Sequence, residues 1–228
     1  MLSPEDLEVL AISLKVACWG TAWSLPPAIA TAYVLSRKRF PGKMLFDAAV
    51  HLPLVLPPVV VGFALLVLFG PRGPLGRLLE PLGIVFAFRW TGAALAAAIM
   101  GFPLMVRAIR LAIDAVDRRL EVAARTLGAT RARVFFTVTL PLAWPGLVTG
   151  ALLGFARSLG EFGATITFVS NIPGETRTLP LAIYTFTQSP GQDAQALRLS
   201  ILSVALSLAA LALSEWLVRR HPGAPAHA

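Results

Sequence analysis

The chain has 228 residues, of which 56% are hydrophobic and 14% charged, and its mean hydropathy is +0.72. These values lie outside the range of soluble domains, so the composition predicts a membrane protein. The formal net charge of +8 is also typical of nucleic-acid-binding proteins, but the basic residues follow the predicted membrane topology described below, and we expect no nucleic-acid partner.

Apolar runs without charge recur along the chain and predict membrane-spanning helices. Each run can cross about 30 Å of hydrocarbon as a helix of roughly 20 residues when flanking residues are included. A further apolar run contains two prolines, a glutamine and several threonines, and we interpret it as a re-entrant or partly buried segment, with a sixth span as the alternative. The expected spans are 12–36, 48–70, 90–110, 134–160 and 197–218, and the re-entrant segment is 178–190.

These elements predict an all-α fold, a polytopic membrane helical bundle of about five transmembrane helices. Residues 1–220 form a single transmembrane domain, and the Pro/Ala-rich residues 221–228 form a disordered tail. The first span is preceded by three acidic residues and no basic one, whereas a signal peptide needs a basic region at this point. We therefore expect the first span to remain in the mature chain.

The second span contains Pro53, Pro57 and Pro58. Each proline leaves a carbonyl without its helical donor, so the prolines predict a bend. A kink that improves packing and a gating hinge are both compatible with this pattern.

The basic residues are concentrated in alternate loops. Thirteen of the 20 lie on one side if five spans alternate, and by the positive-inside rule that side is the cytoplasm. We therefore expect a multi-pass protein of the bacterial or archaeal inner membrane, with the N-terminus outside and the C-terminus in the cytoplasm. The thirteen are Arg37, Lys38, Arg39, Lys43, the seven arginines from Arg107 to Arg133, Arg219 and Arg220.

The largest cytoplasmic segment, residues 117–133, has the pattern of a docking element. Asp117 can cap a short helix, and Gly128 permits a left-handed turn into a second short helix that leads into the fourth span. The alternative is a solvated loop that only orients the protein through its arginines. The apolar stripe of the first helix consists of Leu120, Ala123, Ala124 and Leu127.

This segment resembles the EAA motif of permease subunits of ABC importers, in which E-A-A is followed by three residues, G, nine residues, I, one residue and L-P. The chain departs from the motif at Val122, where the motif has Glu, and carries Glu121 one residue earlier. Ala123, Ala124, Gly128, Leu140 and Pro141 match the motif, with Val138 at the isoleucine position. In that family the motif docks into a groove of the ATPase subunit, and the resemblance implies ATPase coupling for Leu120, Glu121, Ala123, Ala124, Leu127, Gly128, Ala129 and Arg131.

The rest of the chain resembles the molybdate branch of these permeases, with sulfate permeases as close relatives. The stretches that carry the resemblance are LPLVLPPVVVG (52–62), FPLMVRAIR (102–110) and FARSLGEFGATITFVSNIPGETRTLPLAIY (155–184). The resemblance implies a type I importer fold and molybdate import, with tungstate or sulfate as alternatives. It also implies a homodimer, two cytoplasmic ATPase subunits and an external oxyanion-binding protein.

Arg157 and Glu161 are spaced i,i+4 at the outer end of the fourth span. An unpaired charge in an apolar setting is costly, so a structural ion pair is the simpler interpretation, and an outer gate is the alternative. If they form the gate, replacing Glu161 with Gln should impair uptake more than assembly. The neutral polar residues that follow, which could line a pathway for a weakly held dianion, are Thr165, Thr167, Ser170 and Asn171.

No nucleotide-binding loop is predicted in this chain, because its one Gly-Lys pair, Gly42-Lys43, is followed by Met44. We therefore expect no catalytic site, no metal site and no cofactor in the chain, with ATP and Mg²⁺ bound by the partner ATPase. An intramembrane protease would need a nucleophile with a base or metal ligands within the spans, and a passive channel would need no docking helix.

Overall fold

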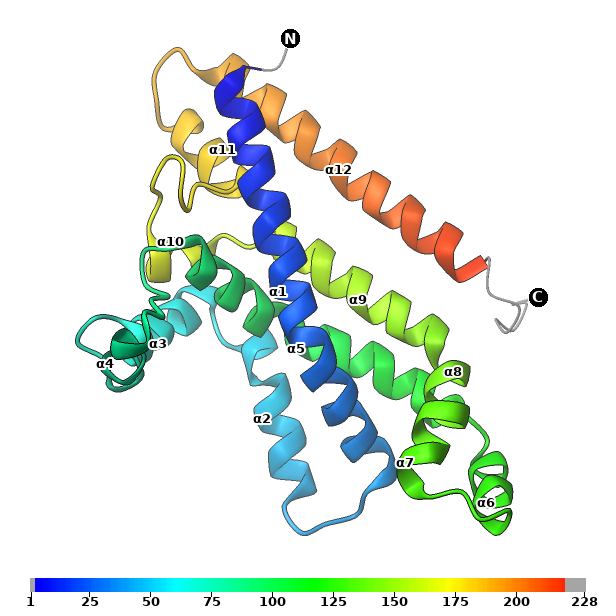
Figure 1. Ribbon diagram of the computed structural model, residues 1–228. Coiled ribbons are helices and arrows are strands. Elements are labelled where there is room, and N and C mark those ends of the chain that lie inside the picture. Colours follow the sequence, from blue (N-terminus) through cyan, green and yellow to red (C-terminus); the bar gives the residue numbers. More distant parts are fainter. Residues whose placement is uncertain (1–2, 220–228) are drawn as a thin grey trace.

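The computed structural model describes residues 3–219, and every regular element in this range is a helix (Figure 1). This confirms the predicted all-α class, while the expected tail, residues 221–228, lies outside the described residues. The elements are α1 (Pro4–Arg37), α2 (Lys43–Val55), α3 (Pro58–Phe69), α4 (Pro74–Leu79), the 3₁₀ turn η1 (Glu80–Leu82), α5 (Trp90–Ala115), α6 (Arg118–Thr126), α7 (Arg131–Val134), the π-helical turn η2 (Phe135–Thr139), α8 (Leu140–Leu142), α9 (Trp144–Leu159), α10 (Gly163–Val169), α11 (Leu179–Thr187) and α12 (Asp193–Arg219).

Three described helices, α1, α5 and α12, are each long and apolar enough to cross a membrane. Two other regions reach this length only as bent pairs. The chain bends by 110° between α2 and α3, and by 72° between Arg131–Leu142 and Trp144–Leu159. The expected spans 48–70 and 134–160 are therefore not single straight helices. Within residues 3–219 there are up to five spans if each bent pair crosses once.

Proline explains the first bend. Helix α2 ends at Val55, Leu56 is extended, and α3 begins at Pro58 with Pro57 before it. A proline has no N–H for the helical ladder and forces the preceding residue out of the α conformation, so two successive prolines stop one helix and start another. The bend was predicted, and the structure gives its size.

The apolar run 178–190 forms only the nine-residue helix α11. At 1.5 Å per residue this helix is about 14 Å long, which is less than half of the hydrocarbon thickness. Its buried face includes Leu179, Leu181 and Phe186. The geometry fits a partly buried segment rather than a sixth span.

Glycines allow the central helices to pack closely. Helix α5 packs against both α1 and α9. A Cβ atom added at Gly20 of α1 would lie 2.9 Å from the carbonyl oxygen of Ala94, and one added at Gly154 of α9 would lie 2.5 Å from the sulfur of Met105. Small residues at helix contacts are the usual means of close packing in membranes, where the hydrophobic effect does not drive helices together.

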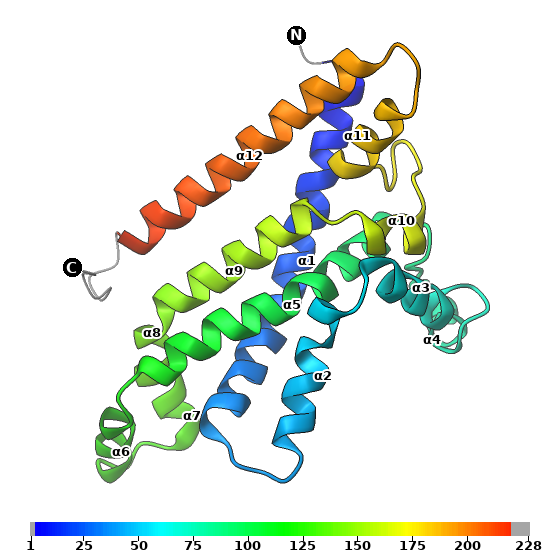
Figure 2. The same ribbon diagram turned by 180° about the vertical axis from the view of Figure 1, so that it is seen from behind.

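The two ends of the molecule carry different elements (Figures 1 and 2). The N-terminus, α11 and the start of α12 lie at one end, and α6, α7 and the α1–α2 connection lie at the other. The predicted docking segment is therefore at the opposite end of α1 from the N-terminus.

Candidate functional site

The segment predicted to dock an ATPase has the expected local structure. The side chain of Asp117 accepts a hydrogen bond from the N–H of Arg119 at 2.9 Å, which caps α6. Gly128 has a φ of +89°, the left-handed conformation that glycine adopts most easily. The chain then enters α7, whose N-cap Thr130 accepts the N–H of Arg133 at 3.3 Å.

Helix α6 exposes large apolar side chains. Leu120 is 48% exposed, Val122 is 58% exposed, and Leu127, just after the helix, is 89% exposed. Ala123 and Arg131 are exposed as well, and Ala124 and Ala129 are half-buried. Exposed large apolar side chains at the end of a helical bundle are typical of a protein interaction site, and Val122 is one of them although it departs from the motif.

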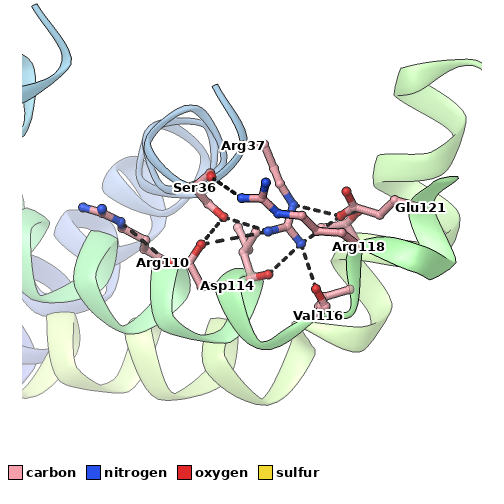
Figure 3. Close-up of polar contacts among 9 residues, drawn as sticks. Ser36, Arg37, Arg110, Asp114, Val116, Arg118 and Glu121 are labelled. Carbon is pink, nitrogen blue, oxygen red and sulfur yellow. Dashed lines mark hydrogen bonds and ion pairs between the residues drawn. The ribbon is translucent and has the colours of Figure 1, made fainter. Parts of the chain in front are cut away.

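Glu121 points away from this exposed surface. Its Oε1 lies 3.0 Å from Nη2 of Arg37 and accepts a hydrogen bond from the hydroxyl of Thr139 at 2.8 Å. The side chain of Glu121 is 17% exposed and that of Arg37 only 7%. Figure 3 shows the guanidinium of Arg37 between Glu121 and the end of α5.

Sequence reasoning missed the structural role of Arg37. We counted it only as one of the basic residues that set the membrane orientation. Its partner Glu121 is 84 positions away in the sequence, so no local pattern indicates the contact. The available signal was the position of Arg37 directly after a long apolar run, which is also where orientation-setting residues occur.

A cavity of about 310 Å³ lies where the end of α1 meets α6 and α7. Basic side chains dominate its lining, and Glu121 is its acidic member. The basic residues are Arg37, Lys38, Arg39, Arg118, Arg125 and Arg131. Two regions of positive charge that are separate in the sequence, at the end of α1 and along α6 and α7, therefore share one surface.

Arg157 and Glu161 form the ion pair expected from their spacing, with Nη1 and Oε2 2.6 Å apart. They are not on one helical face, however, because α9 ends at Leu159 and Glu161 lies beyond it. Glu161 is 2% exposed, and its Oε1 accepts the N–H of Ala164 at 2.8 Å at the start of α10. Both carboxylate oxygens therefore have structural partners.

The neutral pathway candidates lie in different environments. Thr165 is fully buried, and the hydroxyl of Thr167 donates to the carbonyl of Gly163 at 2.9 Å within α10. Ser170 is exposed, with a φ of +64° and a ψ of −161°, a conformation that non-glycine residues rarely adopt and that tends to occur at functional sites. The rare backbone conformation therefore distinguishes Ser170 from the other pathway candidates.

Asn171 holds the loop between α10 and α11 together. Its amide nitrogen donates to the hydroxyl of Thr185 at 2.6 Å, and its carbonyl oxygen accepts from Nε of Arg177 at 3.1 Å. Arg177 also pairs with Glu5 at 3.0 Å. In this conformation the Asn171 amide joins the loop to α11 and α1.

The sequence analysis also missed the contact that one basic residue makes within a predicted span. The ammonium of Lys15, on α1, lies 3.7 Å from the centroid of the Trp90 ring. Trp90 begins α5, and Trp19 stacks obliquely on it with ring centroids 6.4 Å apart. A lysine next to tryptophans is typical of the level where a helix meets the membrane–water interface.

Comparison with known proteins gives consistent results. Residues 24–221 match the family described as binding-protein-dependent transport system inner membrane component. The molybdenum transport system permease protein ModB of Escherichia coli (strain K12) is 60% identical over 220 residues, 96% of this chain and 96% of that protein. The protein of the same name from Haemophilus influenzae is 55% identical over 216 residues, 94% of each.

Other matches are more distant. A probable sulfate transport system permease protein of Chlorokybus atmophyticus is 36% identical over 181 residues, which are 79% of this chain and 63% of that protein. Among solved structures, a bacterial ABC transporter that imports the acidic polysaccharide alginate superposes with a TM-score of 0.77 at 17% identity. The match covers 97% of this chain and 81% of the transporter chain, and at this identity it shows a common fold.

Proposed function

Because the chain belongs to the family of binding-protein-dependent transport system inner membrane components, we propose that it is the permease subunit of an ABC importer that moves molybdate across the inner membrane. The observation that carries the substrate is the 60% identity, over nearly the full length of both chains, to a molybdenum transport permease. Sulfate import is the second candidate, but the sulfate relative is much more distant.

The architecture supports a subunit that is driven by partner ATPase subunits. Its exposed apolar surface on α6 lies at the end of the bundle where the basic loops cluster, which is the cytoplasmic end by the positive-inside rule. Two ATPase subunits dock on this surface and bind ATP and Mg²⁺. The N-terminus then faces outward, where an oxyanion-binding protein delivers the substrate.

A molybdate ion carries two negative charges and cannot cross hydrocarbon unassisted, since even one charge at the bilayer centre costs at least about 2.5 kcal/mol. The pathway must therefore be lined by protein and opened to one side at a time. We propose that two copies of this chain enclose it around a twofold axis. Closure of the ATPases brings the two α6 helices together, and the spans respond by exposing the pathway to the outside.

Neutral groups suit the pathway of such an importer. A carrier that receives its substrate from a separate capture protein needs only weak contacts, because tight binding would slow release. Among the four neutral candidates, Ser170 is exposed and Thr167 and Asn171 are partly exposed. The Asn171 amide is engaged with Thr185 and Arg177, so Ser170 and Thr167 are the candidate lining residues. Arg157, Glu161, Thr165 and Asn171 are candidates for the gate and its support.

Uptake of labelled molybdate and sulfate by proteoliposomes tests the proposal. The vesicles contain this chain with its ATPase and its capture protein. We expect molybdate uptake that requires ATP and persists in excess sulfate. Uptake of sulfate alone would contradict molybdate as the substrate. ATP-independent flux of either ion would contradict the importer and favour a channel.

A further inference from the structure

The end of α1 contains a buried cation with several partners. Arg37 is the last residue of α1, and its side chain is 7% exposed. A buried guanidinium must have its donors satisfied, because an unpaired buried charge is costly. Its partners therefore identify the elements that Arg37 holds together.

Two of these partners are carbonyls at the end of α5. Nη2 of Arg37 donates to the carbonyl of Ile113 at 2.8 Å and to that of Val116 at 3.1 Å. The last carbonyls of a helix lack intrahelical donors and carry partial negative charge. Arg37 thus caps α5 from another helix. Ser36, next to it, donates to Asp114 of α5, so the two helix ends are joined at two points (Figure 3).

The third partner is Glu121 on α6. Nε of Arg37 donates to Oε1 of Glu121 at 3.0 Å, and the same oxygen accepts from the hydroxyl of Thr139 at 2.8 Å. Thr139 is the last residue of the π-helical turn that leads into α8 and α9. One carboxylate oxygen therefore connects the docking helix to α1 and to the start of the bent span.

We infer that Arg37 and Glu121 form a strut that transmits the displacement of α6 to α1, α5 and the bent α7–α9 span together. Glu121 acts through Arg37 and is a positioning residue rather than a contact for the ATPase. The inference deepens the proposed function and rests on it.

The geometry separates this role from docking. Leu120, Val122 and Leu127 are exposed and available to a partner, whereas Glu121 is turned toward the bundle. Helix α6 has only nine residues and is followed by the Gly128 turn. A helix this short has little packing area of its own, so its coupling to the spans depends on a few specific contacts.

The experiment measures molybdate transported per ATP hydrolysed. The complete complex in proteoliposomes carries Glu121→Gln, Arg37→Gln or both. A strut predicts that either single variant still binds the ATPase and hydrolyses ATP, while transport per ATP falls about fivefold or more. The double variant should lose little beyond Arg37→Gln alone, because that change already removes the contact with Glu121.

Two control variants separate a strut from other roles. Asp6→Asn breaks another ion pair with a buried carboxylate at the opposite end of α1, where Asp6 lies 2.8 Å from Arg198. It should lower stability and leave transport per ATP unchanged. Leu127→Ser should weaken binding of the ATPase while complexes that do form remain coupled.

Each other outcome overturns the inference. Unchanged transport per ATP in Glu121→Gln, with less assembled complex, would make the pair purely structural. Loss of ATPase binding in Glu121→Gln would make Glu121 a direct contact. If the unaltered complex shows no ATP-dependent uptake, the proposed function itself fails, whatever the variants do.

Discussion

Glu161 illustrates how this chain accommodates a buried carboxylate. One oxygen pairs with Arg157, and the other accepts the N–H of Ala164 at the start of α10. A carboxylate at a helix N-terminus also interacts favourably with the helix dipole. Because both oxygens are engaged, the structure favours the structural interpretation of this pair over the gate.

We therefore predict that Glu161→Gln mainly affects stability. The amide can still accept from Ala164, but Arg157 loses its counter-ion, at a cost of about 1–3 kcal/mol. Thermal unfolding of the complex, followed by tryptophan fluorescence, should show a lower midpoint. Adding Arg157→Gln should restore part of the loss, since the unpaired cation is then removed. A complex of unchanged stability with strongly reduced uptake would support the gate instead.

Local and distant contacts differ in how far the sequence could predict them. The Arg157–Glu161 pair was predicted because its members are four positions apart. The Arg37–Glu121 pair was not, because it joins residues 84 positions apart through the packing of α1 on α5. For the same reason Asn171 was predicted as a lining residue, although its amide is engaged with Arg177 and Thr185.

At the scale of elements, the turn after α6 determines how the docking helix leaves the bundle. Gly128 has a φ of +89°, and a Cβ atom placed there would meet no other atom within 4 Å. A side chain at this position is therefore opposed by backbone conformation alone. A left-handed residue costs about 1–2 kcal/mol unless it is glycine or, to a lesser degree, asparagine.

The prediction for Gly128 follows from this distinction. Gly128→Val should distort the turn, reduce co-purification of the ATPase and uncouple ATP hydrolysis from transport. Gly128→Asn is the matched control, since asparagine tolerates the left-handed conformation, and it should retain most activity. Wild-type transport by Gly128→Val would count against docking through this segment.

A second prediction at this scale concerns the contact between α3 and α10. A Cβ atom added at Gly62 would lie 2.5 Å from the carbonyl oxygen of Ala164, whereas one added at Gly160 would meet only the Ala156 carbonyl oxygen, at 3.9 Å. Gly62→Ala should thus force the helices apart and destabilise the protein by about 1–3 kcal/mol. Gly160→Ala should be nearly neutral. Equal unfolding midpoints for the two variants would contradict the close approach.

The existence of the helices was more predictable than their paths. Apolar runs identify membrane-spanning helices because backbone polar groups must be satisfied within lipid. The prolines predicted a bend in the second span, but its angle of 110° depends on how α3 packs against α10. The start of α11 is held by a contact that no local pattern predicts, because the hydroxyl of Ser13 on α1, 166 positions away, accepts the N–H of Leu179 at 2.7 Å.

For the whole molecule, the three central helices pack closely against one another. Helices α1, α5 and α9 approach so closely that Cβ atoms added at Gly20 and Gly154 would lie within 3 Å of their neighbours. We expect a route for a dianion to run outside these close contacts. There the described chain exposes large apolar side chains on α2, α3 and α12, including Met44, Val55, Phe63 and Leu197.

A second copy is the simplest way to close a route on this outer surface, since a lipid-exposed wall would leave the anion facing hydrocarbon. We predict that the intact complex contains two copies of this chain with two ATPase subunits. Native mass spectrometry of the detergent-solubilised complex should give the corresponding mass. Two differently tagged versions should co-purify when co-expressed and fail to do so when mixed after solubilisation. A complex with one copy of this chain would contradict a pathway between two copies, because the single copy would then have to surround the ion alone.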